Sequence, residues 1–442
     1  MLDERFYLHN LHHEGGRDAF ENKDPNLKRL QSQVLKYSSS MIHEFPTQEP
    51  CIMTLTGGRQ IGKTTLLKQW MLHLLEKKIP AENIYYLTGE MIDDHHSLVR
   101  IIQSMTAQVK ESHPWYLIVD EVTYIQNWDK GIKFLADLGV FENALVMLTG
   151  SDQVILQESR RRFPGRRGHT NQSVDFHYHP LSFLEFVQLC QPTVMNSKEE
   201  DVSSVFKLFS RYLVHGGFLT AMNDFEKNGK ISLSTYQTYT DWIRGDVLKK
   251  NKSENNLREI FNAVIKTYGS QVSWNALCDH MNIQHPQTVI EYIEILQSMD
   301  VLLVQQALRE DKLSAAPKKP KKIHFKDPFI YRAVQLWLAD QNKVEDSFLV
   351  EGVAVANFAR SNPVYYIKAD GEVDIAIVIG KSFLPIEIKW TQKLQSSELK
   401  QIRKYKNGQI WCKNQQRGKF ESVDVYPLPM ALLKPVHEIL TS

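Results

Sequence analysis

The run CIMTLTGGRQIGKTTLLKQW at residues 51–70 sets the expectation for the N-terminal half of the chain. It holds Gly57-Gly-Arg-Gln-Ile-Gly62-Lys63-Thr64, which fits the pattern G-x-x-x-x-G-K-[ST], between a short apolar run and a helical pattern. Glycines let backbone N–H groups wrap phosphates, and the start of a helix attracts the same negative charge. A strand, a phosphate-binding loop and a helix in this order predict an α/β fold with a parallel sheet.

The predicted nucleotide site is built on this loop. Lys63 can reach the β- and γ-phosphates of ATP, and the Thr64 hydroxyl can ligate Mg²⁺. A glycine-rich turn without a ligand is the alternative, which the flanking strand and helix disfavour. The residues expected to contact ATP are Gly57, Gly58, Arg59, Gln60, Ile61, Gly62, Lys63, Thr64 and Thr65.

Two adjacent carboxylates end another apolar run, Trp115-Tyr-Leu-Ile-Val-Asp120-Glu121. A buried strand rarely ends in this way for structural reasons alone. We expect Asp120 to hold Mg²⁺, directly or through water, and Glu121 to orient the attacking water. Further strands are predicted at Cys51–Thr56, Ile84–Leu87, Ala144–Leu148 and Val174–Tyr178.

Polar and basic residues follow the strand predicted at Ala144–Leu148. Thr149 or Ser151 could sense the γ-phosphate, although a hydroxyl-glycine turn is common in proteins. The segment from Arg160 to Arg167 holds five arginines, of which Arg166 and Arg167 are candidates for an arginine finger reaching a neighbouring subunit. That role would require a homo-oligomer. A solvated basic loop is the alternative.

These motifs resemble those of prokaryotic AAA-type ATPases that carry a C-terminal restriction-endonuclease-like domain. The likeness rests on the loop Gly57–Thr65 and on LIVDEVTYIQNW, LTGS, PGRRG, HPLSFLEF, His215-Gly-Gly-Phe218 and PLPMALL, in this order. It runs from about residue 24 to the end of the chain. One departure is Gly58, where the family usually has proline, and this should not impair phosphate binding.

Composition limits the possible classes of protein. The chain has 442 residues and a formal net charge of +2, which gives no whole-chain electrostatic case for nucleic acid. Its four cysteines form no C-x-x-C pair, and no run is long and apolar enough for a membrane helix. We therefore expect a cytoplasmic protein without a membrane partner. The expected division is an N-terminal segment at 1–50, an ATPase core at 51–190, a helical lid at 191–250, a winged helix-turn-helix at 251–316 and a nuclease-like α/β domain at 317–442.

The winged-helix prediction rests on three helical patterns and an apolar strand between residues 255 and 308. Its expected recognition helix, from His285 to Gln297, presents Glu291 and Glu294 and no lysine or arginine, which disfavours direct reading of bases. We expect an interdomain or protein-contact role instead. The basic stretch from Pro317 to Lys322 is interpreted as a linker whose lysines could still touch a phosphate backbone.

The C-terminal third carries a second acidic constellation. Val373–Ile379 and Phe383–Ile388 predict a hairpin across Gly380 in which Glu387 and Lys389 share a face and Asp374 lies opposite them. Two carboxylates can hold Mg²⁺ or Mn²⁺, and Lys389 can stabilise or deprotonate the attacking water. Glu351, expected to open a helix, could add a metal ligand. Gln401 and Tyr405, expected at i, i+4 on a helix, resemble an accessory motif of some single-strand-trimming nucleases.

The second constellation resembles a PD-(D/E)xK nuclease site. Two alternatives stay open, a surface hairpin with alternating charge and an inherited but inactive nuclease fold. The leading functional hypothesis is an Mg²⁺-dependent AAA-type ATPase that positions or gates a metal-dependent nuclease acting on DNA. The alternatives are an ATP-dependent switch or DNA-binding regulator with an inactive nuclease fold, and a nucleic-acid translocase.

Overall fold

The computed structural model describes residues 4–106, 109, 114–150, 163, 165, 167–168, 170, 172–192, 202–283, 285–339, 344–414, 416–435 and 438–439. The chain divides into two compact units, Met1–His179 and Pro180–Ser442. Within the described residues, no helix combines the length and the apolar character that a bilayer crossing requires.

The first unit is built on a five-stranded parallel sheet with the strand order β2-β3-β4-β1-β5. The strands are β1 (Cys51–Thr56), β2 (Ile84–Thr88), β3 (Trp115–Asp120), β4 (Ala144–Gly150) and β5 (Asp175–His177). The first four strands are almost wholly buried, as expected for parallel strands that helices cover on both faces. The parallel α/β sheet predicted from the sequence is confirmed.

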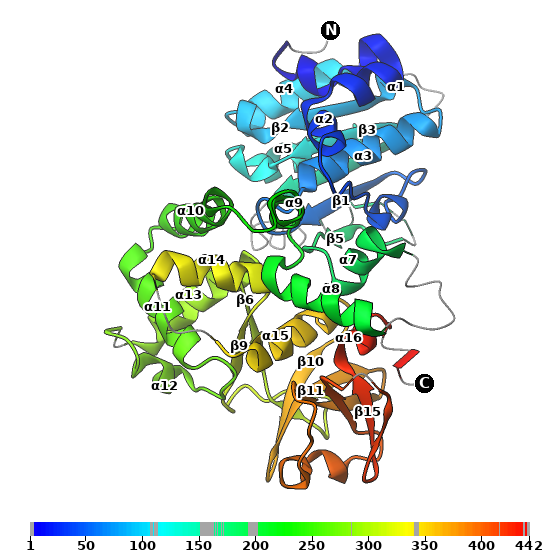
Figure 1. The fold of residues 1–442 in the computed structure, drawn as a ribbon. Coiled ribbons are helices and arrows are strands. Elements are labelled where there is room, and N and C mark those ends of the chain that lie inside the picture. The colour runs from blue at the N-terminus through cyan, green and yellow to red at the C-terminus, as the bar shows by residue number, and fades with distance from the viewer. Residues whose placement is uncertain are drawn as a thin grey trace. The chain divides into compact units, whose positions relative to one another are not determined.

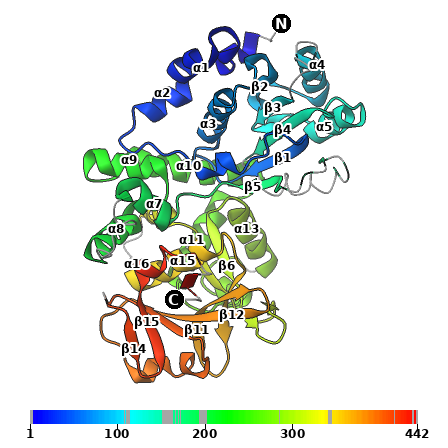
Figure 2. The same cartoon turned by 90° about the vertical axis from the view of Figure 1, so that its right-hand side faces the viewer.

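Helices cover both faces of this sheet (Figure 2). One face carries α3 (Lys63–Glu76), against which α1 (His12–Lys23) and α2 (Pro25–Gln31) pack. The other face carries α4 (His95–Thr106) and α5 (Trp128–Asp137), which contact each other. Their apolar stripes, among them Leu98, Ile102, Ile132 and Leu135, join Leu117, Val119 and Val146 of the sheet in one core.

The second unit begins with a helical region (Figure 1). Its helices are α7 (Phe183–Cys190), α8 (Val202–His215), α9 (Leu219–Asn228), α10 (Leu233–Lys249), α11 (Glu254–Lys266), α12 (Trp274–Cys278), α13 (Pro286–Ser298), α14 (Pro328–Leu338) and α15 (Asp346–Phe358). Strands β6 (Leu302–Gln305) and β9 (Lys322–Phe325) pair antiparallel, and a smaller pair, β7 (Leu308–Arg309) and β8 (Ser314–Ala315), lies between them in sequence.

The stretch predicted as a basic linker is the returning arm of this hairpin. Lys321 exchanges two backbone hydrogen bonds with Val272, each 2.8 Å long, and Lys322 begins β9 with 1% of its surface exposed. The linker interpretation is therefore wrong. Its basic composition suggested a solvated segment, but a strand partner and a buried charge pair, described below, hold it in place.

The C-terminal sheet is mixed, with the strand order β10-β11-β12-β13-β15-β14. Its strands are β10 (Val364–Lys368), β11 (Glu372–Ile379), β12 (Ser382–Lys389), β13 (Gln409–Cys412), β14 (Gly418–Phe420) and β15 (Val423–Pro427). β11 and β12 form the hairpin predicted across Gly380, which has a φ of 58°. α15 packs on β11, and α16 (Leu428–Ala431) packs on β13 and β15.

Candidate functional sites

The loop after β1 has the backbone conformation that its glycines permit. Gly57 has a φ of 150°, and a Cβ added there would lie 2.4 Å from the carbonyl oxygen of Tyr178. Gly62 has a φ of 99°, in the region that L side chains rarely adopt, and directly precedes α3. Arg59 extends from the loop and donates to the Tyr124 hydroxyl at 3.1 Å. A substitution of Gly57 or Gly62 would therefore deform the loop, because Gly57 has no room for a Cβ and Gly62 has a backbone conformation that other residues rarely adopt.

Lys63 lies inside the loop. Its Nζ donates to the carbonyl oxygens of Gly57 at 3.1 Å and Gly58 at 3.0 Å, and it lies 3.9 Å from Glu121 Oε1. The residue is 6% exposed. A buried ammonium on the first residue of a helix creates a strongly positive position at the end of the sheet.

Asp120, at the end of β3, accepts hydrogen bonds from three hydroxyl groups. Thr64 and Tyr86 donate to its Oδ2 at 2.7 and 2.6 Å, and Thr149 donates to its Oδ1. β1, β3 and β4 run parallel, so their carboxyl ends meet at one edge of the sheet and bring Thr64, Asp120 and Thr149 together. Tyr86 reaches Asp120 from the neighbouring strand β2. Oxygen atoms of a carboxylate and a threonine are ligands suited to Mg²⁺. Thr64 and Asp120 therefore fit the predicted metal.

Glu121 follows in the left-handed region, with a φ of 52°. The backbone N–H of Glu121 donates to Thr149 Oγ1 at 3.0 Å. A Cβ added to Gly89 would lie 2.3 Å from the carbonyl oxygen of Glu121, so only glycine fits at that position. Thr149 thus binds the carboxylate of Asp120 and the backbone of Glu121. Such a strained turn persists only where surrounding contacts fix it, and it is typical of functional sites.

Sequence reasoning did not identify Tyr86, Lys68 and Asp24. Lys68, on α3 four residues after Thr64, is fully buried, with its Nζ 3.5 Å from the centroid of the Tyr86 ring and 3.5 Å from Asp24 Oδ2. Burial lowers the pKa of Lys68 to about 8. Burial and Asp120 raise the pKa of Tyr86 well above its usual value, so Tyr86 keeps the proton that it donates to Asp120.

Two of the predicted sensor and finger residues, Ser151 and Arg166, lie outside the described residues. Arg167 is described, and its guanidinium binds within its own unit. It forms a bidentate pair with Asp175 and donates to the carbonyl oxygens of Ile52 at 3.2 Å and Val174 at 3.1 Å. This geometry contradicts the finger prediction for Arg167, because these partners fix the side chain on the edge of its own sheet.

The second predicted site lies in the second unit, around a cavity of about 320 Å³. Glu351 of α15, Asp374 of β11 and Lys389 of β12 line it, together with Glu372 and Lys322. The register of β11 with β12 places Asp374 opposite Glu387, and Asp374 Oδ2 accepts from the backbone N–H of Ile388 at 2.9 Å. The structure brings together all four charged groups that the sequence predicted for this site.

Glu387 and Lys389 share a face, as period-two alternation predicts, and Lys389 Nζ lies 2.8 Å from Glu387 Oε1. The other oxygen, Oε2, is buried and has no hydrogen-bond partner among the residues that the structure describes. Burial and the nearby Asp374 raise the pKa of Glu387 to about 8, and the same causes raise that of Glu351 to about 8. A buried carboxylate oxygen without a donor, in a group of acidic side chains, suits a divalent cation.

Lys322 and Glu372 are the two charged residues named for this cavity that sequence reasoning missed. Lys322 Nζ lies 2.7 Å from Glu351 Oε1 and 3.1 Å from Asp374 Oδ1, and it also pairs with Glu372. Burial alone would lower the pKa of Lys322, but Asp374, Glu351 and Glu372 outweigh burial and raise it well above the usual value. The ammonium is therefore a permanent positive charge among these carboxylates.

Two expectations about the surroundings of this cavity are corrected. Glu351 lies in the middle of α15 and not at its opening. Gln401 and Tyr405 do not lie on one α-helix, because the segment forms two 3₁₀ turns, Ser396–Leu399 and Ile402–Lys404. The buried Leu399 ends the first turn and the buried Ile402 begins the second. The two side chains still meet, with Gln401 Nε2 3.4 Å from the Tyr405 hydroxyl.

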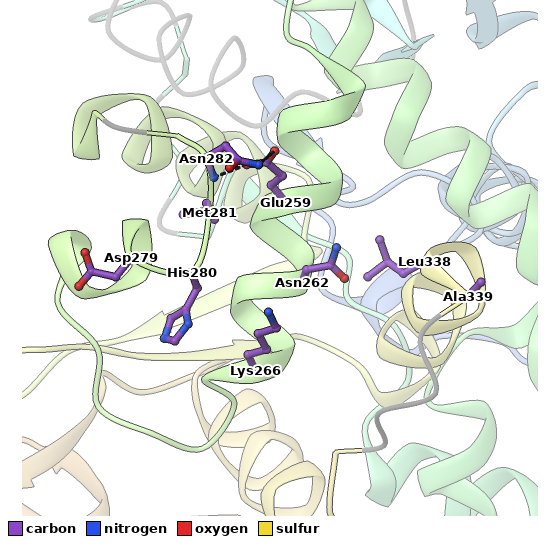
Figure 3. Close-up of a pocket in the computed structure, with 9 residues that line it drawn as sticks. All are labelled: Glu259, Asn262, Lys266, Asp279, His280, Met281, Asn282, Leu338 and Ala339. Atoms are coloured by element: carbon purple, nitrogen blue, oxygen red, sulfur yellow. Dashed lines mark hydrogen bonds between the residues drawn. The ribbon is translucent and has the colours of Figure 1, made fainter.

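A wider hollow of about 650 Å³ lies between α11, the turn after α12 and the end of α14 (Figure 3). Its acidic side chains are Glu259 and Asp279, and its basic ones are Lys266 and His280. Figure 3 shows Glu259 bound to Asn282, which donates to it through its backbone N–H at 2.7 Å and its side chain at 2.9 Å. Glu259 thus holds this turn in place, and the lining charges do not converge as those around Asp374 do.

Comparisons with known proteins give a partial match. Residues 49–187 match the family model of the AAA domain, and residues 206–341 match a domain of unknown function, DUF8612. An uncharacterized protein of Haemophilus influenzae (strain ATCC 51907 / DSM 11121 / KW20 / Rd) is 30% identical over 175 residues. That match covers 38% of this chain and 39% of that protein, so the chain spans about two fifths of its relative's length.

Solved structures resemble the chain more distantly. The Walker-type ATPase PABY2304 of Pyrococcus abyssi has 12% sequence identity and a TM-score of 0.43, over 72% of this chain and 97% of that one. The ORC2 protein of Aeropyrum pernix, solved as ADPNP-ADP complexes, has 13% identity and a TM-score of 0.40, over 74% of this chain and 93% of that one. The loop after β1, Asp120, Glu121 and Thr149 all lie inside the AAA-domain match.

Proposed function

We propose that this chain, in which residues 49–187 form an AAA-type P-loop ATPase domain, uses its ATP cycle to control a metal-dependent nuclease in its C-terminal part. The proposed substrate of that nuclease is DNA, and the proposed working form is a homo-oligomer. The observation that carries the nuclease proposal is the convergence of Glu351, Asp374 and Lys389 at one cavity, with Glu387 paired to Lys389 at 2.8 Å.

In the ATPase domain, the loop Gly57–Thr65 binds the phosphates and Lys63 neutralises the β- and γ-phosphate charge. Thr64 and Asp120 would hold Mg²⁺, which when bound offsets charge on the transferred phosphoryl group. Glu121 orients the attacking water, and its short distance to Lys63 is consistent with a place beside the γ-phosphate. Thr149 holds Asp120 and Glu121 in position through two hydrogen bonds.

In the C-terminal site, Asp374 and Glu387 would hold Mg²⁺ or Mn²⁺, with Glu351 as a further ligand. When bound, the metal would polarise a phosphodiester and lower the pKa of a water molecule. Lys389 then donates hydrogen bonds to the negative charge that develops on the phosphate oxygens. Its ammonium is already oriented by Glu387, which lies 2.8 Å away.

The domain division expected from the sequence enters this proposal with one change, because the winged helix expected at 251–316 extends to its returning strand β9 at Lys322–Phe325. Its support is the order α11, α12, α13 and β6, followed by the antiparallel partner β9. Glu291 of α13 forms an ion pair with Lys252 at 2.6 Å. The expected recognition helix therefore carries an acidic side chain that already binds another residue of this chain. We assign the winged helix to contacts between protein segments rather than to reading of bases.

A second function is favoured by one observation, the ammonium of Lys322 among the carboxylates. In that alternative the C-terminal fold is catalytically inactive, and the chain is an ATP-dependent switch or a DNA-binding regulator. The two functions differ in whether a phosphodiester is cleaved.

The decisive experiment incubates the full chain, with Mg²⁺ or Mn²⁺ and with or without ATP, with linear, nicked and single-stranded DNA and with RNA. We expect cleavage of DNA that is lost in Asp374→Asn and Glu387→Gln and is slower by about 10²- to 10³-fold in Lys389→Ala. Asp370→Asn is the matched control, since this exposed carboxylate near β11 pairs with Lys404 away from the cavity.

Two outcomes contradict the nuclease proposal. If the wild-type chain leaves every substrate intact under all conditions, the switch function takes its place. If cleavage persists in the Asp374→Asn/Glu387→Gln double variant, the activity belongs to another site. Control of the nuclease by the ATP cycle is tested with Glu121→Gln, which should bind ATP without hydrolysing it. In this variant the rate of DNA cleavage should stay at the value of the ATP-bound wild type.

A further inference from the structure

The carboxylate cavity of the C-terminal part already contains a cation supplied by the chain. Lys322 is 1% exposed, and its Nζ contacts Glu351, Glu372 and Asp374. Two of these three carboxylates are proposed metal ligands, so the ammonium and the metal would use the same oxygen atoms.

Lys322 does not belong to the sheet that carries Asp374 and Glu387. It begins β9, whose partner is β6, and it is preceded by residues 317–321, which together with Lys322 we name the basic arm. The arm is tied down along its length. The Tyr366 hydroxyl donates to the carbonyl oxygen of Pro320 at 2.5 Å, and Lys319 Nζ donates to that of Lys368 at 2.7 Å. The ammonium of Lys322 is therefore held in the cavity by a segment that lies outside the C-terminal sheet.

One buried carboxylate oxygen near this cluster is unsatisfied. Among the described residues, Glu387 Oε2 has no hydrogen-bond partner, whereas Glu351 Oε1 and Asp374 Oδ1 both contact Lys322. A metal held by Glu387 and Asp374 would share Asp374 with the ammonium. Two cations that share a carboxylate in a buried site repel each other strongly.

We propose that Lys322 is a built-in competitor of the divalent metal, so that metal binding at Asp374 and Glu387 requires the Lys322 ammonium to leave the cavity. This inference rests on the proposed function, because it concerns the same carboxylates. It adds a regulatory element, since any event that withdraws the basic arm would raise the affinity of the site for metal. Such withdrawal would break the contacts of Pro320 with Tyr366 and of Lys319 with Lys368.

The first test measures the affinity of the nucleotide-free full chain for Mn²⁺ by electron paramagnetic resonance. Binding that disappears in Asp374→Asn is assigned to this cavity. We expect Lys322→Met to bind Mn²⁺ at least about tenfold more tightly than the wild type, because the competing charge is removed. Lys322→Arg keeps the charge and should bind as the wild type does. Lys318→Met removes an exposed charge from the same arm and should change nothing.

The second test uses the wild-type chain and does not depend on the folding of a variant. Lysines are acetylated with acetic anhydride, and the modified peptides are quantified by mass spectrometry. Lys322 should be protected without metal and become reactive at saturating Mn²⁺, whereas Lys318 should react in both states. If Mn²⁺ binds while Lys322 stays protected, or if Lys322→Met has an unchanged or weaker affinity, the competition is overturned.

The two proposals fail in different ways. Tighter Mn²⁺ binding by Lys322→Met without cleavage of any nucleic acid supports the competition and contradicts the nuclease. Cleavage by a wild-type chain whose Lys322 stays protected in Mn²⁺ supports the nuclease and contradicts the competition. Absence of Mn²⁺ binding to the wild type and to Lys322→Met contradicts both.

Discussion

Asp120 shows how single residues build the nucleotide site. Its two oxygens accept from hydroxyls of Thr64, Tyr86 and Thr149, which come from α3, β2 and β4. A carboxylate with several charge-assisted hydrogen bonds has little rotational freedom. Thr64 and Thr149 follow recognisable patterns at the ends of strands, whereas Tyr86 is one of two adjacent tyrosines in an apolar run. Its role depends on which face of β2 it occupies.

At this scale we predict that Tyr86→Phe raises the Mg²⁺ concentration needed for half-maximal ATP hydrolysis. The variant keeps the ring and removes only the hydroxyl that orients Asp120, and a hydrogen bond to a charged group is worth about 1.5–3 kcal/mol. Tyr85→Phe is the matched control, since its hydroxyl lies 3.5 Å from the carbonyl oxygen of Met105. Phosphate release measured against Mg²⁺ concentration tests this. Identical curves for Tyr86→Phe and Tyr85→Phe would remove Tyr86 from the site.

At the scale of elements, a buried ion pair connects α2 with α3. Asp24 caps α2 by accepting from the backbone N–H groups of Asn26 at 2.9 Å and Leu27 at 3.2 Å, and it pairs with Lys68 of α3. Lys68 also donates to the carbonyl oxygen of His9 at 2.9 Å. The helix that begins at the phosphate loop is thereby fixed to the N-terminal segment within the first unit.

We predict that Lys68→Met lowers the free energy of unfolding of the first unit by about 3–5 kcal/mol, because it leaves Asp24 buried without a cation. The double variant Lys68→Met/Asp24→Asn should recover part of this loss, since asparagine can still cap α2 and carries no charge. Urea denaturation of the four members of this double-mutant cycle measures the coupling. Equal stability of Lys68→Met and the wild type would show that the pair contributes nothing.

At the scale of the whole molecule, buried titratable groups make the stability of each unit depend on pH. In the first unit, burial lowers the pKa of His12 to about 3, and burial also lowers those of His9 and His13. Below about pH 6.5 these histidines bind protons in the unfolded chain but not in the folded unit. The free energy of unfolding therefore decreases as the pH is lowered. In the second unit two effects oppose each other, because burial lowers the pKa of His215 to about 4 and of His324 to about 3 but raises those of Glu351 and Glu387 to about 8.

We therefore predict that the first unit loses stability between pH 7.5 and 5.5, with about 1.4 kcal/mol of that loss due to His12. His12→Gln should remove this part, because glutamine does not titrate and can donate to the carbonyl oxygen of Ile84, as the ring does at 2.8 Å. His96→Gln, at an exposed position of α4, is the control. The readout is hydrogen exchange of β2, corrected for its intrinsic pH dependence. An unchanged pH dependence in His12→Gln would contradict the assignment.

The parallel sheet, the loop after β1, the Asp120–Glu121 turn and the β11–β12 hairpin could all be predicted from sequence, because each is encoded locally. Glycine spacing, short apolar runs and period-two alternation act over a few residues. Local patterns were insufficient at residues 396–405, where the chain forms two short 3₁₀ turns in place of a helix and the i, i+3 spacing of the buried Leu399 and Ile402 fits either structure. They were also insufficient for Arg167, whose partner Asp175 is eight residues away.

Tertiary structure alone determined which residues from distant parts of the chain come into contact. Lys322 is 29 residues from Glu351 and 52 from Asp374, and Tyr86 is 34 residues from Asp120. A lysine among lysines and a tyrosine beside a tyrosine carry no local signal for such a partner. Each acquires its role because strand order and burial remove it from water, where only a specific opposite charge or acceptor offsets the cost of desolvation.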